Sequence, residues 1–282
     1  MGWRRILVGG LASAVAAVGL ALVVGARRQQ RALVADVDRL LGDAGAATRQ
    51  ASRLDDLDAP PPVVRYLRQA LLSNASIRLV RLQQIGRLRT DARGDRWMAF
   101  EAEHVAAPAA VGFVWNARVR IAPLLHVRVR DALIAGEGSG QVALLSAFTV
   151  AHDAGTPEMH SGSLHRYLAE AVWYPTALLP GPGLRWDPVD GNTALATLTS
   201  HGLSVSLEFR FSDTGEVAAI YTAGRWGTFG DRYAQVPWEG HFRDYQDRDG
   251  VRIPLDADVG WYVDGQWQPV WEGRITTFDA EY

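Results

Sequence analysis

The chain has 282 residues, a formal net charge of -2 at pH 7 and no cysteine, and all 29 of its basic side chains are arginines. This length fits one large domain or two small ones. The near-neutral charge gives no reason to expect nucleic acid as a partner. The lack of cysteine excludes disulfides, thiol nucleophiles and a lipid-modified N-terminal cysteine. Because tryptophan is seldom left fully exposed, we expect most of the ten tryptophans in a core or a groove.

An uncharged apolar run over residues 6–26 follows a pair of arginines at positions 4 and 5. At a rise of about 1.5 Å per residue, a helix of this length just crosses a hydrocarbon core of about 30 Å. A cleaved secretory signal ending at Ala26 is the alternative, but the two arginines directly after it disfavour cleavage. We therefore expect residues 1–31 to be a retained single-pass anchor in the cell membrane. Arginines flank both ends of the run, and of the two orientations we expect the body outside the cytoplasm.

The remainder of the chain divides into a short connection and one β-rich domain. Residues 32–59 are expected to continue as an amphipathic helix and then as a polar linker. A run of prolines from Pro60 then begins a short helix, since proline is tolerated in a first helical turn. From Ile77 the apolar period changes from 3.6 to 2, which predicts about ten or eleven strands in a single domain over residues 60–282. We expect a loop over residues 224–235.

Residues 161–180 form the one strong helical pattern within this β-rich domain. A serine at position 161 or 163 is expected to cap its start, and Pro175 to kink or break it near Trp173. One face of the helix is apolar throughout. The alternating strands before and after it then predict an α+β fold, mostly antiparallel, in which a curved meander sheet or incomplete barrel wraps the central helix.

The other face of this helix carries Arg166, Glu170 and Trp173, at steps of three and four residues. A solvent-facing helix surface normally carries arginine and glutamate but not tryptophan. Two interpretations remain open. Either Trp173 is packed in a core beside a surface Arg–Glu pair, or it lines a cleft with that pair at its polar edge.

Three further tryptophans fall on the apolar faces of predicted strands. Trp115 lies in an alternating segment, and Trp238 and Trp271 each begin a Trp-Glu-Gly sequence near the C-terminus. The glycines permit close approach or strong curvature, so the last two tryptophans are expected on one concave face. They are either core residues or ligand-lining residues. The opposite face of residues 113–130 carries several arginines, which form either a basic ladder or a wet face balanced by nearby acids.

No catalytic or cofactor motif occurs in the sequence, and lysine-dependent chemistry is impossible. The histidines and acids from His152 to His165 crowd the start of the central helix. His160 and His165 are five residues apart, which does not place them on one helix face, and no pair has a recognised metal-ligand spacing. We therefore predict no catalytic residues, no metal site and no cofactor.

Five stretches of the chain carry a resemblance to a known family: residues 61–68 (PPVVRYLR), 113–120 (FVWNARVR), 166–180 (RYLAEAVWYPTALLP), 204–211 (SVSLEFRF) and 237–240 (PWEG). They resemble a bacterial family, common in actinobacteria, that is known only as a domain of unknown function. The resemblance covers residues from Pro60 to the C-terminus and is most specific over residues 170–180. It implies no catalytic residues, because the family has no assigned activity. The body is also similar in outline to the open half-barrels of lipoprotein-carrier proteins, a fold-level analogy.

The leading hypothesis is a membrane-tethered, non-catalytic module that binds a lipid or other amphiphile in an aromatic groove. The membrane is its partner through residues 6–26. Two alternatives stay open: a structural or partner-binding membrane protein with a filled core, and a hydrolase that uses the cluster from His152 to His165. The expected ligand-binding residues are Trp115, Arg166, Glu170, Trp173, Trp238 and Trp271.

Overall fold

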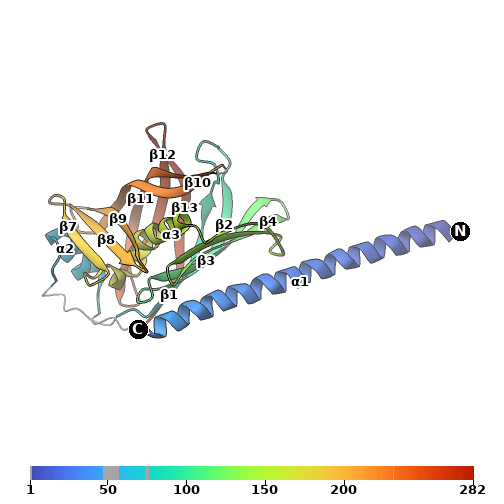
Figure 1. Ribbon diagram of the computed structural model, residues 1–282, viewed down its shortest axis with the longest axis horizontal. Helices are drawn as coiled ribbons and strands as arrows, with labels where there is room; N and C mark the ends of the chain where they lie inside the picture. The colour runs from blue at the N-terminus through green and yellow to red at the C-terminus, as the bar shows by residue number, and fades with distance from the viewer. Residues whose placement is uncertain (1, 47–56, 74–75, 231) are drawn as a thin grey trace.

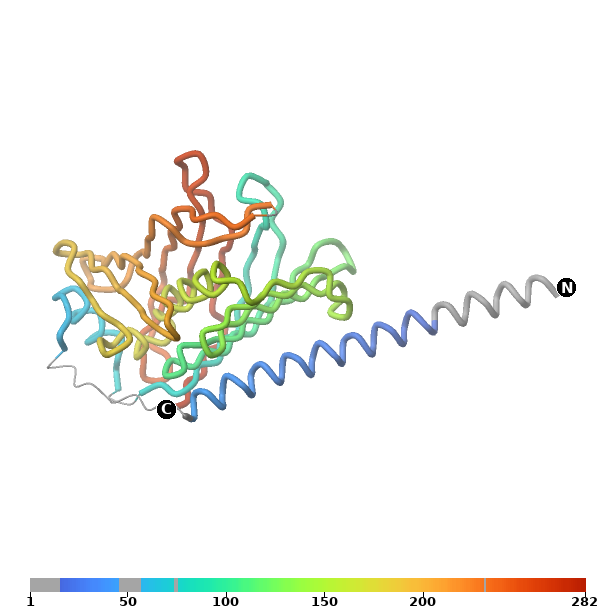
Figure 2. The backbone as a smooth tube through the Cα atoms, in the orientation of Figure 1, coloured from blue at the N-terminus to red at the C-terminus, as the bar shows by residue number. Residues whose placement is uncertain are grey.

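The computed structural model describes residues 2–46, 57–73, 76–230 and 232–282, with residues 2–15 and 46 described by backbone alone. Most of the predicted linker lies outside the described residues, as do the side chains of residues 6–15 in the predicted membrane span. Figure 2 traces the backbone of the chain. A long helix extends from one side of a β-rich body.

The described strands form one antiparallel sheet of thirteen members. Its order is β6-β5-β4-β3-β2-β1-β13-β12-β11-β10-β9-β8-β7, so every neighbouring pair is consecutive in sequence except β1 and β13. Pairing of β1 with β13 joins the first half of the meander to the second. The strands are β1 Leu79–Leu88, β2 Met98–Ala107, β3 Gly112–Ala122, β4 Leu125–Ile134, β5 Glu137–Leu144, β6 Phe148–Ala154, β7 Leu184–Pro188, β8 Thr193–Ser200, β9 Leu203–Phe211, β10 Val217–Phe229, β11 Arg232–Arg248, β12 Val251–Val263 and β13 Gln266–Glu281.

Helix α3, Pro157–Glu170, crosses between the two edges of this sheet, from β6 to β7. It contacts β4 and β5 on one side and β9 and β10 on the other. These strand pairs lie far apart in the sheet order, so the sheet must curve around the helix to reach it from both sides. Figure 1 shows α3 inside the curve of the sheet. The predicted α+β fold, with an open curved antiparallel sheet around a central helix, is confirmed.

The bounds of α3 differ from the predicted 161–180 at both ends. Thr156 is the N-cap, and its hydroxyl accepts a hydrogen bond from the backbone N–H of Met159 at 3.2 Å. Pro157 follows it in the first turn, where its missing donor costs nothing. The serines at 161 and 163 therefore lie inside the helix rather than at its cap. After Glu170 the chain continues as two 3-10 turns, Ala171–Trp173 and Pro175–Leu178, so the break expected ahead of Pro175 is found.

The apolar stripe of α3 and the turns after it is buried in the main core. Leu164, Tyr167, Leu168 and Tyr174 are each at most 1% exposed. Burial of such side chains stabilises the fold by roughly 1.5–3 kcal/mol each. The phenol of Tyr167 donates to the carbonyl of Pro108, and that of Tyr174 donates to the carbonyl of Tyr167. The polar ends of these large side chains are thus satisfied inside the core.

The predicted loop over residues 224–235 is instead the end of the β10–β11 hairpin. Trp226 pairs with Gln235 and Phe229 with Arg232. A register shift between Thr222 and Arg225 interrupts the ladder, and such irregularities change the direction of side chains. The glycines and mixed polar residues that suggested a loop here belong to an irregular strand pair that reaches α3.

Helix α1, Gly2–Ala46, packs its C-terminal half on the face of β2, β3 and β4 that is turned away from α3. Leu33 and Leu40 are buried there against Val114 and Ile134. Asp36 pairs with Arg130 of β4 at 3.3 Å. Of the arginines on this sheet face, Arg130 thus has an acidic partner in α1, whereas Arg128 donates to the side chains of Asn116 and Ser146.

Among the residues whose placement is described, no helix contains a stretch both long and apolar enough to cross a bilayer. The described part of α1 is nevertheless apolar and exposed before it reaches the sheet. Val18, Leu20 and Val24 are 59%, 65% and 57% exposed. Figure 1 shows this end of α1 extending well away from the body.

The short helix α2, Pro61–Ala70, begins at the proline run, as predicted. Its buried residues include Val63, Tyr66 and Leu67, and it contacts β8 and β12. It therefore adds to the main core at the end of the sheet opposite β6.

Gly86 of β1 sits where the two halves of the sheet join, and a Cβ at this position would collide with the backbone of Glu272 and Gly273 in β13. We expect Gly86→Ala to destabilise the fold by about 1–3 kcal/mol, because the strands must separate to admit the methyl group. Urea unfolding followed by tryptophan fluorescence measures this loss. Gly191→Ala is the control, since nothing lies within 4 Å of its added Cβ. Equal stability of both variants would contradict the prediction.

Candidate functional site

A cavity of about 320 Å³ lies between α3 and the concave face of the sheet. Its wall is formed by α3 and the turn after it together with strands from both halves of the meander. Most of the lining is aromatic or aliphatic, with a few charged side chains. All six residues expected at a binding site contribute to this one wall: Trp115, Arg166, Glu170, Trp173, Trp238 and Trp271.

The aromatic part of the wall is held in place by buried hydrogen bonds and ring contacts. The indole N–H of Trp115 donates to the side-chain oxygen of Gln84 at 2.8 Å. The indole of Trp173 donates to the carbonyl of Pro254 at 3.1 Å. Trp271 stacks on Phe100, with ring centroids 5.6 Å apart. A buried indole needs such a partner, and its presence fixes the ring. The wall is therefore largely preformed.

Arg166 and its two carboxylate partners form the polar edge of the cavity. Its guanidinium donates to Glu170 at 2.7 Å and to Asp131 at 2.8 Å. The same group lies over the Trp115 ring, 4.9 Å from the centroid. Burial lowers the pKa of Arg166, but the two carboxylates outweigh burial and raise it overall. Burial raises the pKa of Asp131 against the opposing effect of Arg166.

A second cavity arginine, Arg225 of β10, has no such partner. Its Nε and Nη2 donate to the carbonyl oxygen of Gly162 in α3 at 3.3 and 3.1 Å. The guanidinium lies 4.6 Å from the ring centroid of Trp238 and 5.1 Å from that of Trp261. Within the described chain, no carboxylate forms an ion pair with it. Burial and the nearby Arg166 lower the pKa of Arg225 to about 10, so it stays charged at neutral pH.

Behind the polar edge lies a buried pair, His104 and Glu170. His104 is 0% exposed, and within the described residues neither of its ring nitrogens has a hydrogen-bond partner. Its Nε2 lies 3.7 Å from Oε2 of Glu170, an oxygen that is likewise buried without a hydrogen bond. Burial lowers the pKa of His104 to about 4, more than the nearby Glu170 raises it. The imidazole is therefore neutral at pH 7, and the pair is not an ion pair there.

The histidine cluster near α3 does not converge on this cavity. His160 accepts a hydrogen bond from the backbone N–H of Gly138 at 2.9 Å, and Nδ1 of His165 lies 3.1 Å from the carbonyl of Ser161. Neither they nor the exposed His152 line the cavity wall. Over the described ranges, no group of three or more histidine and acidic side chains is arranged to hold a metal ion.

The site residues that sequence reasoning missed are Arg225, Asp131 and Trp261, which also line the cavity. Arg225 fell in the expected loop over residues 224–235, so its position on a strand facing α3 was not evident. Asp131 directly follows Arg130 in β4. Because successive strand residues face opposite sides of a sheet, this position alone places it on the face opposite the arginines. Trp261 lies on β12, where every second residue faces the cavity, as Ala257 and Val259 also do.

Comparison with known proteins gives a family and a set of distant folds. Residues 57–280 match a family described as "Family of unknown function (DUF6920)". No curated protein matches the chain.

Three solved structures are similar to the chain at low identity. A putative outer-membrane lipoprotein-sorting protein domain from Vibrio parahaemolyticus is 8% identical with a TM-score of 0.40, and the match covers 72% of this chain and 85% of that one. A LolA-superfamily protein from Nitrosomonas europaea is 7% identical with a TM-score of 0.40, and the match covers 78% of this chain and 92% of that one. A β-barrel-like protein from Brucella abortus is 9% identical with a TM-score of 0.24, and the match covers 73% of this chain and 99% of that one. Both resemblances expected from the sequence are found, and likenesses at these TM-scores carry no argument about function.

The neutral burial of His104 makes stability depend on pH. Its pKa of about 4 in the folded state lies below the roughly 6.5 of an exposed histidine, so the unfolded chain binds this proton more readily. Stability from this source is full above pH 6.5 and falls as the pH drops toward 4. Between pH 7 and 5.5 we expect a loss of about 1 kcal/mol through this residue.

The free energy of unfolding, measured in urea at both pH values on the full chain in detergent, checks this. His104→Gln cannot titrate at this position, so its free energy of unfolding should fall by about 1 kcal/mol less than that of the native chain between pH 7 and 5.5. His152→Gln, at an exposed position, is the matched control and should behave like the native chain. Identical pH dependence of all three proteins would contradict the prediction.

Proposed function

Since the chain belongs to the DUF6920 family, which has no assigned activity, we propose its function from its own residues: a membrane-tethered, non-catalytic module that binds a lipid or other amphiphile in the cavity beside α3. The body lies outside the cytoplasm in this proposal. Residues 6–26 of α1 provide the tether. The cavity provides the binding site.

The observation that carries the proposal is the composition of the cavity wall. A volume of about 320 Å³ falls within the range of small-molecule sites, which combine apolar walls with a few placed polar groups. Five tryptophans supply much of the apolar wall, and Arg166, Glu170, Asp131 and Arg225 are its charged members on and beside α3. A ligand with an apolar body and a polar head matches this division.

The charges of the wall favour an acidic head. The cavity is lined by three arginines, Arg89, Arg166 and Arg225, but by only two carboxylates, Asp131 and Glu170. Both carboxylates are bound to Arg166, and Arg89 donates to backbone carbonyls and to Gln268. Among the described residues, neither Arg89 nor Arg225 forms an ion pair with a carboxylate, and Arg225 is the one of the two that contacts α3 and the ring of Trp238. A carboxylate or phosphate head beside Arg225 would form a charge-assisted hydrogen bond in a partly desolvated site.

The cavity also separates this proposal from its rivals. A purely structural protein with a filled core requires a solid interior beside Trp173, where about 320 Å³ is open. A hydrolase based on the cluster from His152 to His165 requires those side chains to meet in one pocket. Instead His160 and His165 are each held by backbone groups of separate segments.

Filling the cavity should abolish binding of an amphiphile. Val142→Phe adds an aromatic ring to the wall from β5, and we expect loss of lipid from the full chain purified from its own membranes, as seen by native mass spectrometry. The matched control is Val150→Phe on β6, a residue that is 60% exposed and does not line the cavity. Native protein that carries no lipid and shows no change of tryptophan fluorescence with added palmitate or hexadecanol would overturn the proposed function.

Removing the charge of Arg225 should separate acidic from neutral ligands. We expect Arg225→Gln to weaken palmitate binding by roughly 10- to 100-fold, the equivalent of about 1.5–3 kcal/mol for a hydrogen bond to a charged group, and to leave hexadecanol binding unchanged. Arg252→Gln, a surface arginine paired with Glu216 and Asp247, is the control. Fluorescence titration of the native full chain and both variants with each ligand measures these affinities. Equal loss for both ligands would place the head elsewhere in the cavity.

A further inference from the structure

Two neighbouring hairpin ends of the sheet expose apolar side chains to solvent. Leu124, in the two-residue loop between β3 and β4, is 100% exposed, and Leu125 beside it is 36% exposed. Phe148, at the start of β6, is 45% exposed. Leu124 also has a φ of +63°, a left-handed conformation that glycine or asparagine adopts far more readily. A strained and fully exposed leucine gains nothing for the fold, so its apolar side chain points to a contact outside the body.

The position of these hairpin ends along α1 is fixed by direct contacts. Gly25 touches the turn between β5 and β6, because a Cβ on it would collide with Ala147. Four residues further on, Gln29 donates to the hydroxyl of Thr149 at 3.0 Å. The next anchor along the helix is the ion pair of Asp36 with Arg130 in β4. Helix α1 and strand β4 therefore run in the same direction along one another, with residue numbers rising together.

This register puts the β3–β4 loop beside the apolar run of α1. The turn that touches Gly25 is also bonded to His126, since the N–H of Leu145 donates to its carbonyl at 2.9 Å. Leu124 lies two residues before His126, or roughly 7 Å further toward the start of α1 at about 3.3 Å per strand residue. At about 1.5 Å per helix residue, that distance corresponds to roughly four or five residues of α1. Leu124 is therefore level with the last part of the run over residues 6–26.

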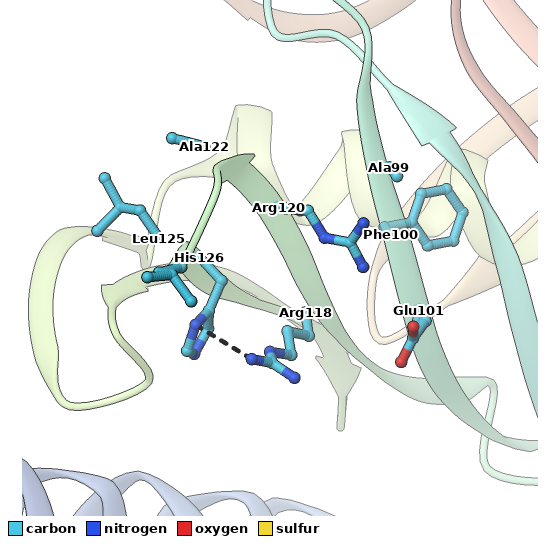
Figure 3. A pocket seen from close by; sticks show the side chains of 9 residues that line it. Ala99, Phe100, Glu101, Arg118, Arg120, Ala122, Leu125 and His126 are labelled. Atoms are coloured by element: carbon cyan, nitrogen blue, oxygen red, sulfur yellow. Dashed lines mark hydrogen bonds between the residues drawn. The ribbon is translucent and has the colours of Figure 1, made fainter.

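Basic side chains lie on the body side of these apolar ends. Arg118 and Arg120 are exposed on β3, and Arg27 and Arg28 are exposed on α1. Arg120 pairs in register with His126 and Arg118 with Arg128. Figure 3 shows Arg118 and Arg120 beside the strand end that carries Leu125. An apolar tip followed by arginines is the order that a membrane interface requires, with acyl chains first and phosphate headgroups next.

We propose that the β3–β4 and β5–β6 hairpin ends form a second membrane contact, in which Leu124, Leu125 and Phe148 insert at the lipid surface beside α1. This contact rests on the tether of the proposed function but not on ligand binding. The bilayer is the occupant because the apolar ends continue the apolar surface of α1. Insertion covers the exposed leucines and sets the body at a fixed distance from the lipid, since α1 is one continuous helix.

The natural absence of cysteine allows a direct test by single-cysteine labelling. The full chain is reconstituted in phosphatidylcholine vesicles containing phosphatidylglycerol, with the environment-sensitive dye NBD at one introduced cysteine. Leu124→Cys and Phe148→Cys report on the proposed contact. Val18→Cys reports on the tether itself. Leu72→Cys, 51% exposed beside α2 at the far end of the body, is the matched control.

We expect blue-shifted emission and quenching by lipid-borne spin labels at positions 18, 124 and 148, and water-like emission at 72. A lipid signal at position 18 with water-like emission at 124 and 148 overturns the second contact and leaves the tether standing. Water-like emission at all four positions removes the tether and with it the contact. Equal lipid signals at 72 and 124 also overturn the proposal, because the contact would then not be specific to these hairpin ends.

Discussion

The seating of α3 within the curved sheet is the constraint on which the rest of the structure depends. The apolar stripe of the helix must be buried, and strands from both halves of the meander converge on it. A sheet that reaches one helix from both sides bends but is not closed, and α3 joins its two edge strands. The opposite face of α3 then borders open space, which is the cavity. Burial of one helix face thus creates the candidate site beside the other.

The charges in this cavity are difficult to explain by stability alone. Buried ion pairs contribute little to folding, because the loss of hydration offsets their attraction. Arg166 with its two carboxylates is at least balanced, whereas Arg225 adds a positive charge that is held by a carbonyl and two indole rings. The neutral His104 beside Glu170 adds a second imperfectly satisfied group. Such groups concentrate where a protein binds or reacts rather than where it merely packs.

Helix α1 connects this site to the apolar N-terminal run without a break. Leu33 and Leu40 fix the helix to β2–β4, and the face of those strands away from α1 carries Trp115 and Asp131 of the cavity wall. The same strands therefore hold α1 on one side and the candidate site on the other. In the proposed arrangement, the hairpin ends that carry Leu124 and Phe148 bring this part of the sheet to the lipid surface.

The sequence alone determined the elements with strong periodicity. The alternation from Ile77 onward predicted an antiparallel sheet, and the stripe around Leu164 and Tyr167 predicted the central helix, because burial of one face leaves a regular apolar period. The step of four that places Arg166 and Glu170 on one face also follows from helix geometry alone, whereas Trp173 lies in the 3-10 turn after α3.

Tertiary structure decided what those faces meet. Arg225 lies in an irregular hairpin whose register shift has no counterpart in local periodicity, so only strand pairing across β10 and β11 places it against α3. The β1–β13 contact, which joins the two halves of the sheet, pairs residues nearly two hundred positions apart. Local sequence reports which side of an element is apolar. The element that covers that side is fixed by packing between distant parts of the chain, and the cavity exists only as a result of that packing.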